Sequence, residues 1–268
     1  MARDPLADFT RTAFTDGSVT HSVYRSGSGP AVIVMAEMPG ITPKVADFAR
    51  AVVGAGFTVW MPSLFGRDGM AATAGEFLRM FPATCVSKEF AAFATNRTAP
   101  VTVWLRALAA HAHGECGGPG VGAIGMCFTG GFALGMMVDD VVLAPVLSQP
   151  SLPLALSAKH RASIHLSPDD VEAVRARAEA GVCVLGLRFT GDPLSPPDRF
   201  ESLRRLLGDR FIGVEIDSSA GNAFGIRSKA HSVVTEDLVA GDPHHPTAEA
   251  LAQVLAFFAE RLLPAPGA

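Results

Sequence analysis

The chain has 268 residues, of which 49% are hydrophobic, and carries a formal net charge of −4 at pH 7. Such a chain can bury a sizeable core, and its length suits one large α/β domain or two small ones. A weakly acidic chain without a Lys/Arg-rich tract lacks the charge pattern of a protein that binds nucleic acid or an anionic membrane. We therefore expect neither kind of partner.

The N-terminal residues 1–14 contain charges and no apolar signal-peptide core, so we expect a cytoplasmic protein. The longest apolar runs are far shorter than the roughly 20 residues that cross a membrane. The four cysteines form no CxxC pair, and in a reducing cytosol we expect them to be free thiols: Cys85, Cys116, Cys127 and Cys183.

Short apolar runs alternate along the chain with segments of helical periodicity, which predicts a parallel sheet covered by helices. The expected strands are 31–36, 57–61, 121–126, 141–147, 182–189 and 211–216. The expected helices are 43–54, 101–113, 129–137, 198–207, 247–263 and one that starts after Ser167. Since this rhythm never changes, we expect residues 1–268 to form a single α/β domain with an open, mostly parallel sheet.

Two segments interrupt this regular pattern. Residues 66–98 contain small residues and two Phe-bearing stretches, and could form a cap over a pocket or an ordinary crossover with an extra helix. Residues 148–167 form a long connection before the helix that Ser167 begins.

A thiol lies in a glycine-rich turn between an expected strand and an expected helix, in the sequence Gly125-Met-Cys127-Phe-Thr129-Gly-Gly131. In G-x-nucleophile-x-G turns, small neighbours relieve the crowding around a strained nucleophile. Thr129 replaces the usual second glycine. A thiol at a helix N-terminus is favoured as thiolate, and the amide of Phe128 points to where an oxyanion would form.

Two other interpretations use the same residues. The spacing Gly120-x-Gly122-x-x-Gly125 matches a dinucleotide-binding fingerprint, but phosphate binding needs those glycines after the strand, and here they precede it or lie within it. Alternatively, Cys127 is a small buried residue, as most free cysteines are.

An acid and a histidine follow Cys127 in the chain order that α/β-hydrolases use. Asp192 comes directly after the strand 182–189, at the sheet edge where such folds hold their sites. His231 lies in the loop between the last strand and the last helix. We therefore predict a Cys127–His231–Asp192 triad.

Other residues could fill these roles. Asp198 and Asp217 are rival acids, and the remaining candidate bases are His160, His165, His244 and His245. His111, His113 and Cys116 could bind a metal, although histidines two residues apart face different sides of a helix and no fourth ligand is evident.

These motifs together resemble the dienelactone hydrolase family, whose members are cysteine hydrolases of the α/β-hydrolase fold. The resemblance extends from about Ala31 to the final helix. It includes the thiol turn 125–131, GDPLSPPDR (191–199), Ala230-His231-Ser232 and MAEMPGI (35–41).

The resemblance implies further roles at the first of these strands. Glu37 is expected to interact with the resting thiol or with its histidine and to reorient when substrate enters; alternatively, it caps the loop before the next helix. A carboxylate near a thiol opposes thiolate formation, so such a glutamate must move to assist. The backbone amide of Met38 is the expected second oxyanion donor.

Enzymes that hydrolyse dienelactone hold the substrate carboxylate with two arginines, and the resemblance assigns Arg67 to the first position. Thr235 occupies the second position, so half of the clamp is missing unless Arg227 or Lys229 replaces it. Arg67 could equally be a surface residue. This favours an ester or lactone other than dienelactone.

We therefore expect a cofactor-free hydrolase, without a metal, that cleaves an ester or lactone through a thioester on Cys127. The alternative is a hydrolase-fold protein that binds a small molecule without turnover, since one fold hosts several functions. The expected assembly is a monomer or a homodimer.

Overall fold

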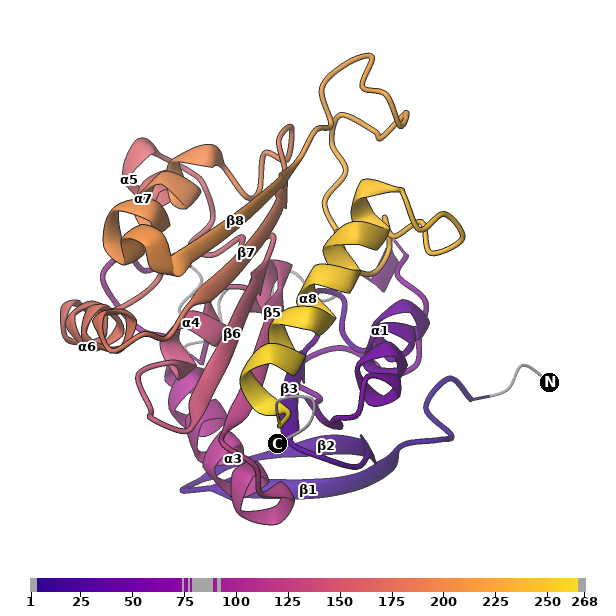
Figure 1. Ribbon diagram of the computed structural model, residues 1–268, viewed down its shortest axis with the longest axis vertical. Coiled ribbons are helices and arrows are strands. Elements are labelled where there is room, and N and C mark those ends of the chain that lie inside the picture. Colours follow the sequence, from indigo (N-terminus) through magenta and orange to yellow (C-terminus); the bar gives the residue numbers. More distant parts are fainter. Residues whose placement is uncertain (1–3, 74, 77, 79–88, 91–92, 265–268) are drawn as a thin grey trace.

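The computed structural model describes residues 4–73, 75–76, 78, 89–90 and 93–264. Its centre is an eight-stranded sheet with the order β1-β2-β4-β3-β5-β6-β7-β8 (Figure 1). The strands are β1 (Thr10–Asp16), β2 (Val19–Gly27), β3 (Ala31–Met35), β4 (Thr58–Pro62), β5 (Val121–Met126), β6 (Val142–Ser148), β7 (Val184–Phe189) and β8 (Phe211–Ile216). From β4 to β8 neighbouring strands are parallel, whereas β1 and β2 pair antiparallel at one side.

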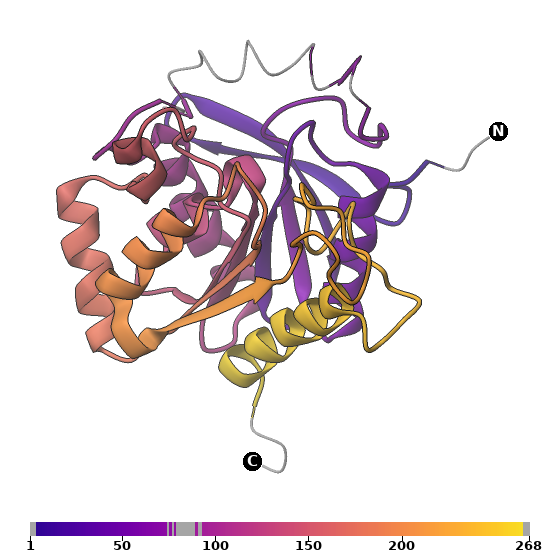
Figure 2. The same cartoon turned by 90° about the horizontal axis from the view of Figure 1, so that it is seen from above.

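Helices cover both faces of this sheet (Figures 1 and 2). They are α1 (Pro43–Gly54), α3 (Pro100–Cys116), α4 (Phe132–Met136), α5 (Ala158–Ala162), α6 (Pro168–Glu179), α7 (Pro197–Leu207) and α8 (Pro246–Leu262). Helices α1 and α8 pack on one face, and α3, α4, α6 and α7 pack on the other, so the sheet separates two apolar cores. This is the α/β-hydrolase fold, and the expected fold class is confirmed.

Side-chain caps explain where two of the helices begin. The Thr42 side chain accepts a hydrogen bond from the amide of Val45, and the Ser167 side chain accepts one from the amide of Asp170. Each cap satisfies an amide that has no partner within its helix. Both helix starts are therefore confirmed.

The hairpin of β1 and β2 is absent from the sequence-based prediction. Strand β1 is mostly exposed, β2 is only partly buried, and polar residues interrupt both, so neither carries a continuous apolar run. The overlooked signal is Asp16-Gly17, a typical hairpin turn, in which Gly17 has a φ of +55°. The short helix α5 was also missed, since it has no buried residue and no apolar periodicity.

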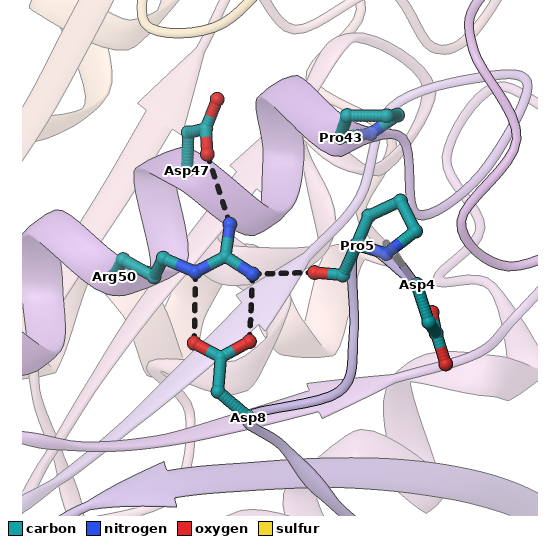
Figure 3. Close-up of a pocket in the computed structure, with 6 residues that line it drawn as sticks. All are labelled: Asp4, Pro5, Asp8, Pro43, Asp47 and Arg50. Carbon is teal, nitrogen blue, oxygen red and sulfur yellow. Dashed lines mark hydrogen bonds and ion pairs between the residues drawn. The ribbon is translucent and has the colours of Figure 1, made fainter. Parts of the chain in front are cut away.

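Ahead of this hairpin, hydrogen bonds and ion pairs connect the N-terminal segment to α1. The residues involved line a surface hollow of about 410 Å³ (Figure 3). The Arg50 guanidinium donates to both carboxylate oxygens of Asp8, at 2.8 and 2.7 Å, and to Asp47 at 2.9 Å. It also donates to the carbonyl oxygen of Pro5. Because Arg50 satisfies these acceptors itself, the hollow is explained as a structural junction.

The cap predicted for 66–98 falls largely on residues outside the described ranges, and it stays a prediction. Of its described residues, Phe90 packs in the core beside the thiol turn. No helix in the described part of the chain is both long and apolar enough to cross a membrane.

Candidate active site

Cys127 follows β5 directly and has a φ of +53°, in the left-handed region that non-glycine residues rarely adopt. Its neighbours must be small because the chain folds back tightly. A Cβ atom on Gly125 would lie 2.1 Å from the carbonyl oxygen of Thr129, and one on Gly130 would lie 2.6 Å from Cα of Pro150. The thiol turn therefore has the strained geometry typical of turns that carry a nucleophile, and a single 3₁₀ turn runs over Cys127–Thr129.

Thr129, which departs from the usual glycine, is completely buried and joins two strand ends. Its hydroxyl oxygen lies 3.0 Å from the carbonyl oxygen of Met35 and accepts from the amide of Met126 at 2.9 Å. This threonine therefore fastens the nucleophile turn to the end of β3.

The structure brings His231 and Asp192 together, although 39 residues separate them in the chain. Nδ1 of His231 lies 2.7 Å from Oδ2 of Asp192, whose side chain is only 1% exposed. Asp192 follows β7, and His231 lies in the long connection between β8 and α8 (Figure 1). A buried carboxylate at this distance fixes the orientation and tautomer of the imidazole.

The second ring nitrogen of His231, Nε2, is buried and has no hydrogen-bond partner among the residues that the structure describes. Burial alone would lower the pKa of His231, but the Cys127 sulfur in its thiolate form and the Asp192 carboxylate raise it well above its usual value. The thiol is thus close enough to act electrostatically on the ring, and Nε2 is available for its proton.

Asp237 also holds His231, and sequence reasoning missed this residue. Its Oδ2 accepts from the backbone amides of His231 at 2.9 Å and Ser232 at 3.1 Å. Its Oδ1 accepts from Arg227 at 2.5 Å. Burial would raise the pKa of Asp237, but these donors lower it overall. No sequence motif identifies an acid whose side chain accepts hydrogen bonds from backbone amides five and six residues earlier in the chain.

Glu37 is 3% exposed and lies two residues after β3. Among the described residues, its carboxylate accepts from side chains around the histidine loop: from Ser232 at 2.6 Å, from Gln149 at 3.3 Å, and from Thr235. Burial raises its pKa, and the two hydroxyl donors and the nearby His231 only partly offset that effect. Its predicted exchange with the thiol stays a prediction.

The two predicted oxyanion donors occupy neighbouring strand ends. Met38 follows β3 and Phe128 follows β5, and these parallel strands pair through Met35 and Gly125. Both residues are buried. Their strand positions agree with the expected role, which stays a prediction.

The expected carboxylate-binding cations have acidic partners. Arg67 is 53% exposed in its side chain and pairs with Glu76, and Arg227 is 77% exposed and pairs with Asp237. Lys229 is exposed. Thr235, at the second arginine position, is buried against Glu37.

Aromatic side chains surround the nucleophile turn on the side of α4. The Phe128 ring lies 5.8 Å from Phe65, 5.5 Å from Phe90 and 6.5 Å from Phe132 between centroids. We call these four residues the Phe cluster. Its contacts are predominantly edge-to-face, a favourable arrangement for aromatic rings.

The rival acids and histidines are used elsewhere. Asp198 pairs with Arg161 at 2.8 Å, and Asp217 accepts from the amide of Ser219. His245 caps α8, and its Nδ1 lies 2.7 Å from Oγ1 of Thr247. The remaining three have other contacts: His160 contacts Ser157, His165 packs on Phe132, and the backbone of His244 bonds to Asp242.

Two of the three residues of the alternative metal site have other partners. The His111 ring stacks on Phe14 at 5.1 Å, and Cys116 Sγ accepts from the indole of Trp60 at 3.4 Å. In the described ranges, no three His, Cys, Asp or Glu side chains are grouped to hold a metal ion.

Comparisons with known proteins identify the family and the fold. A family model described as the dienelactone hydrolase family matches residues 19–261. No curated protein matches the chain. Among solved structures, a dienelactone hydrolase-like promiscuous phosphotriesterase from metagenomic libraries is 16% identical, with a TM-score of 0.60 and coverage of 95% of this chain and 98% of that one.

Two further structures share the fold. A cold-adapted esterase from an Arctic intertidal metagenomic library is 15% identical, with a TM-score of 0.56 and coverage of 94% of this chain and 92% of that one. A thioesterase domain from the curacin biosynthetic pathway is 11% identical, with a TM-score of 0.54 and coverage of 92% and 99%.

Proposed function

Because the chain belongs to the dienelactone hydrolase family, and is therefore a hydrolase, we propose that it cleaves a carboxylic ester or lactone through Cys127, His231 and Asp192. One observation carries the proposal. Cys127, whose backbone is left-handed, is near enough to raise the pKa of the partly buried His231, which bonds through one ring nitrogen to a buried acid and has no described partner at the other.

In the proposed mechanism, Nε2 of His231 takes the thiol proton and Cys127 Sγ attacks the carbonyl carbon of the substrate. The amides of Met38 and Phe128 stabilise the oxyanion, and Asp192 stabilises the imidazolium. The imidazolium then protonates the leaving alkoxide, which leaves a thioester on Cys127. Water, activated by His231, attacks this thioester and releases the acid and the thiol.

We further propose that the acyl group of the substrate is uncharged. Arg67 and Arg227 are already paired with carboxylates, and Thr235 replaces an arginine. The Phe cluster beside the turn favours apolar groups. These features fit an apolar ester better than an acid with a second carboxylate.

The test is turnover of a panel: p-nitrophenyl acetate, p-nitrophenyl butyrate, the mono-p-nitrophenyl ester of glutaric acid, and several lactones. A phosphotriester is included because one structural neighbour is described as a phosphotriesterase. We expect hydrolysis of neutral esters or lactones, a lower kcat/KM for the anionic glutarate ester, and an acyl adduct on Cys127 by intact mass.

The adduct must disappear in Cys127→Ala. A Cys183→Ala variant is the matched control, because that thiol lies outside the site and bonds to the carbonyl of Gly181. No turnover across the panel and no adduct on Cys127 would favour the non-catalytic binding protein instead.

A further inference from the structure

The buried carboxylate of Glu37 is held by donors from two different segments. Ser232 and Thr235, on either side of a single turn of the histidine loop, donate to its two oxygens. Gln149, which follows β6, donates from a third direction. The carboxylate thus links the ends of β3 and β6 to the loop that carries His231.

The burial, backbone conformation and contacts of Gln149 indicate a specific role beside Glu37. It is completely buried, and its φ of +35° is unusual for a residue with a side chain. Its amide nitrogen reaches Glu37, and its amide oxygen accepts from Ser148 and, at 3.5 Å, faces the backbone nitrogen of Val233. The side chain therefore contacts Glu37 with one end and the histidine loop with the other.

The loop segment that these residues hold follows His231 immediately. Ser232, Val233, Val234 and Thr235 are all buried. Glu236, next in line, accepts from the hydroxyl of Thr42 at 3.2 Å, so the anchoring extends over one full turn. Asp237 fastens the same turn through its backbone amides.

We propose that Glu37 and Gln149 are positioning residues that clamp Ser232–Thr235 and so hold His231 against Cys127, and that Glu37 does not gate the thiol. A gate must leave its partners when substrate enters. Glu37 would have to give up two hydroxyl donors and an amide donor, all buried, and leave them unsatisfied. A fixed clamp keeps every one of them satisfied.

The two roles predict opposite changes in thiol reactivity, and the measurement needs no substrate. We would measure the rate of Cys127 alkylation by iodoacetamide across pH, with peptide mapping to separate the other cysteines. A gating carboxylate opposes thiolate formation, so Glu37→Gln would alkylate faster than the wild type. The clamp predicts slower alkylation in Glu37→Gln and Thr235→Val, because the displaced imidazole supports the thiolate less.

The size of the effect follows from geometry, since a shift of about 1 Å at a catalytic group costs up to about a hundredfold. We expect Thr235→Val to slow alkylation at pH 7 by about tenfold or more and to shift its pH profile upward. Thr235→Ser restores the hydroxyl and should recover most of the rate. The matched control is Thr58→Val, which loses a buried hydroxyl bond of 2.7 Å to Gly29 at the opposite end of the sheet.

Ser232→Ala provides a second variant if Thr235→Val does not fold, since it removes the donor to the other oxygen of Glu37. The clamp is refuted if Glu37→Gln alkylates faster, or if Thr235→Val and Ser232→Ala both match Thr58→Val. The inference rests on the proposed triad, but the two fail separately. Absence of turnover in the wild type overturns the proposed function, whereas the alkylation rates still decide between clamp and gate.

If the wild type hydrolyses an ester, the clamp also predicts how kcat and KM change. Thr235→Val should lower kcat about tenfold while KM stays within about twofold, because the loop orients the base and does not bind the acyl group. A change in KM alone would contradict the clamp.

Discussion

Nδ1 of His231 lies 2.7 Å from a carboxylate oxygen of Asp192, and the side chain of that acid is almost fully buried. Removing the charge in Asp192→Asn leaves the shape and removes one of the interactions that raise the pKa of His231, while burial continues to lower it. We expect the pKa of His231 to fall, as measured by NMR titration of its ring, and ester hydrolysis to fall by about 10³- to 10⁴-fold.

Asp217→Asn is the control, because Asp217 follows β8 as Asp192 follows β7 but is exposed and accepts from the amide of Ser219. An equal loss of activity in both variants would overturn the choice of Asp192.

The raised pKa of His231 also makes the stability of the folded protein depend on pH. Because the folded state holds the pKa of His231 above its usual 6.5, protonation of this ring stabilises the fold fully below about pH 6.5. That contribution is lost as the pH rises through the folded-state value. We expect the Tm of the wild type to decline more from neutral to alkaline pH than the Tm of Asp192→Asn. Parallel Tm curves would contradict this linkage.

Asp237 offers a test of how the histidine backbone is held. Asp237→Ala leaves the amides of His231 and Ser232 without their acceptor, so we expect kcat to fall about tenfold and the free energy of unfolding to fall by about 1.5–3 kcal/mol. Urea denaturation and steady-state kinetics measure the two effects. Arg227→Met removes only the exposed partner of Asp237 and should cost about 1 kcal/mol or less.

Gly125 is required by close packing. Gly125→Ala places a methyl group 2.1 Å from a backbone oxygen, so we expect a loss of about 1–3 kcal/mol in the free energy of unfolding, with disturbance of the thiol turn. Gly114→Ala, in α3, meets nothing within 4 Å and should stabilise the protein by up to about 1 kcal/mol. Thermal unfolding of the two variants should therefore shift in opposite directions.

Arg199 organises the connection after β6. Its buried guanidinium donates to four carbonyl oxygens between Pro150 and Ser163, and burial lowers its pKa to about 10. Arg199→Lys cannot reach all four acceptors, and each buried acceptor left without a donor costs about 1–3 kcal/mol. We expect a lower urea midpoint and faster proteolysis within 150–163, whereas Arg161→Met, at an exposed ion pair, should change little.

Much of the fold followed from the sequence because the parallel strands are continuous apolar runs and because helices such as α1 and α6 begin with clear caps. Asp192 and His231 were predicted to act together because each follows a predicted strand in the order that this fold uses, and the structure places them 2.7 Å apart. The hairpin of β1 and β2 escaped because an exposed pair of strands needs no apolar run.

The residues that hold the histidine loop could not be predicted in the same way. Gln149 and Asp237 act through contacts across strand ends or with backbone amides, and neither has a spacing relative to His231 that a motif would encode. Thr235 was noticed only as a missing arginine, whereas its hydroxyl has a partner of its own in Glu37. These contacts exist only in the folded protein, where the histidine loop packs against the strand ends.

Because the backbone of Cys127 is left-handed, stability and reactivity favour different residues at this position. Glycine accepts a φ of +53° without the strain of about 1–3 kcal/mol that a side chain brings there. A screen for heat-resistant variants that does not also select for turnover should therefore enrich Cys127→Gly. Directed evolution of this protein therefore has to screen each variant for both heat resistance and turnover.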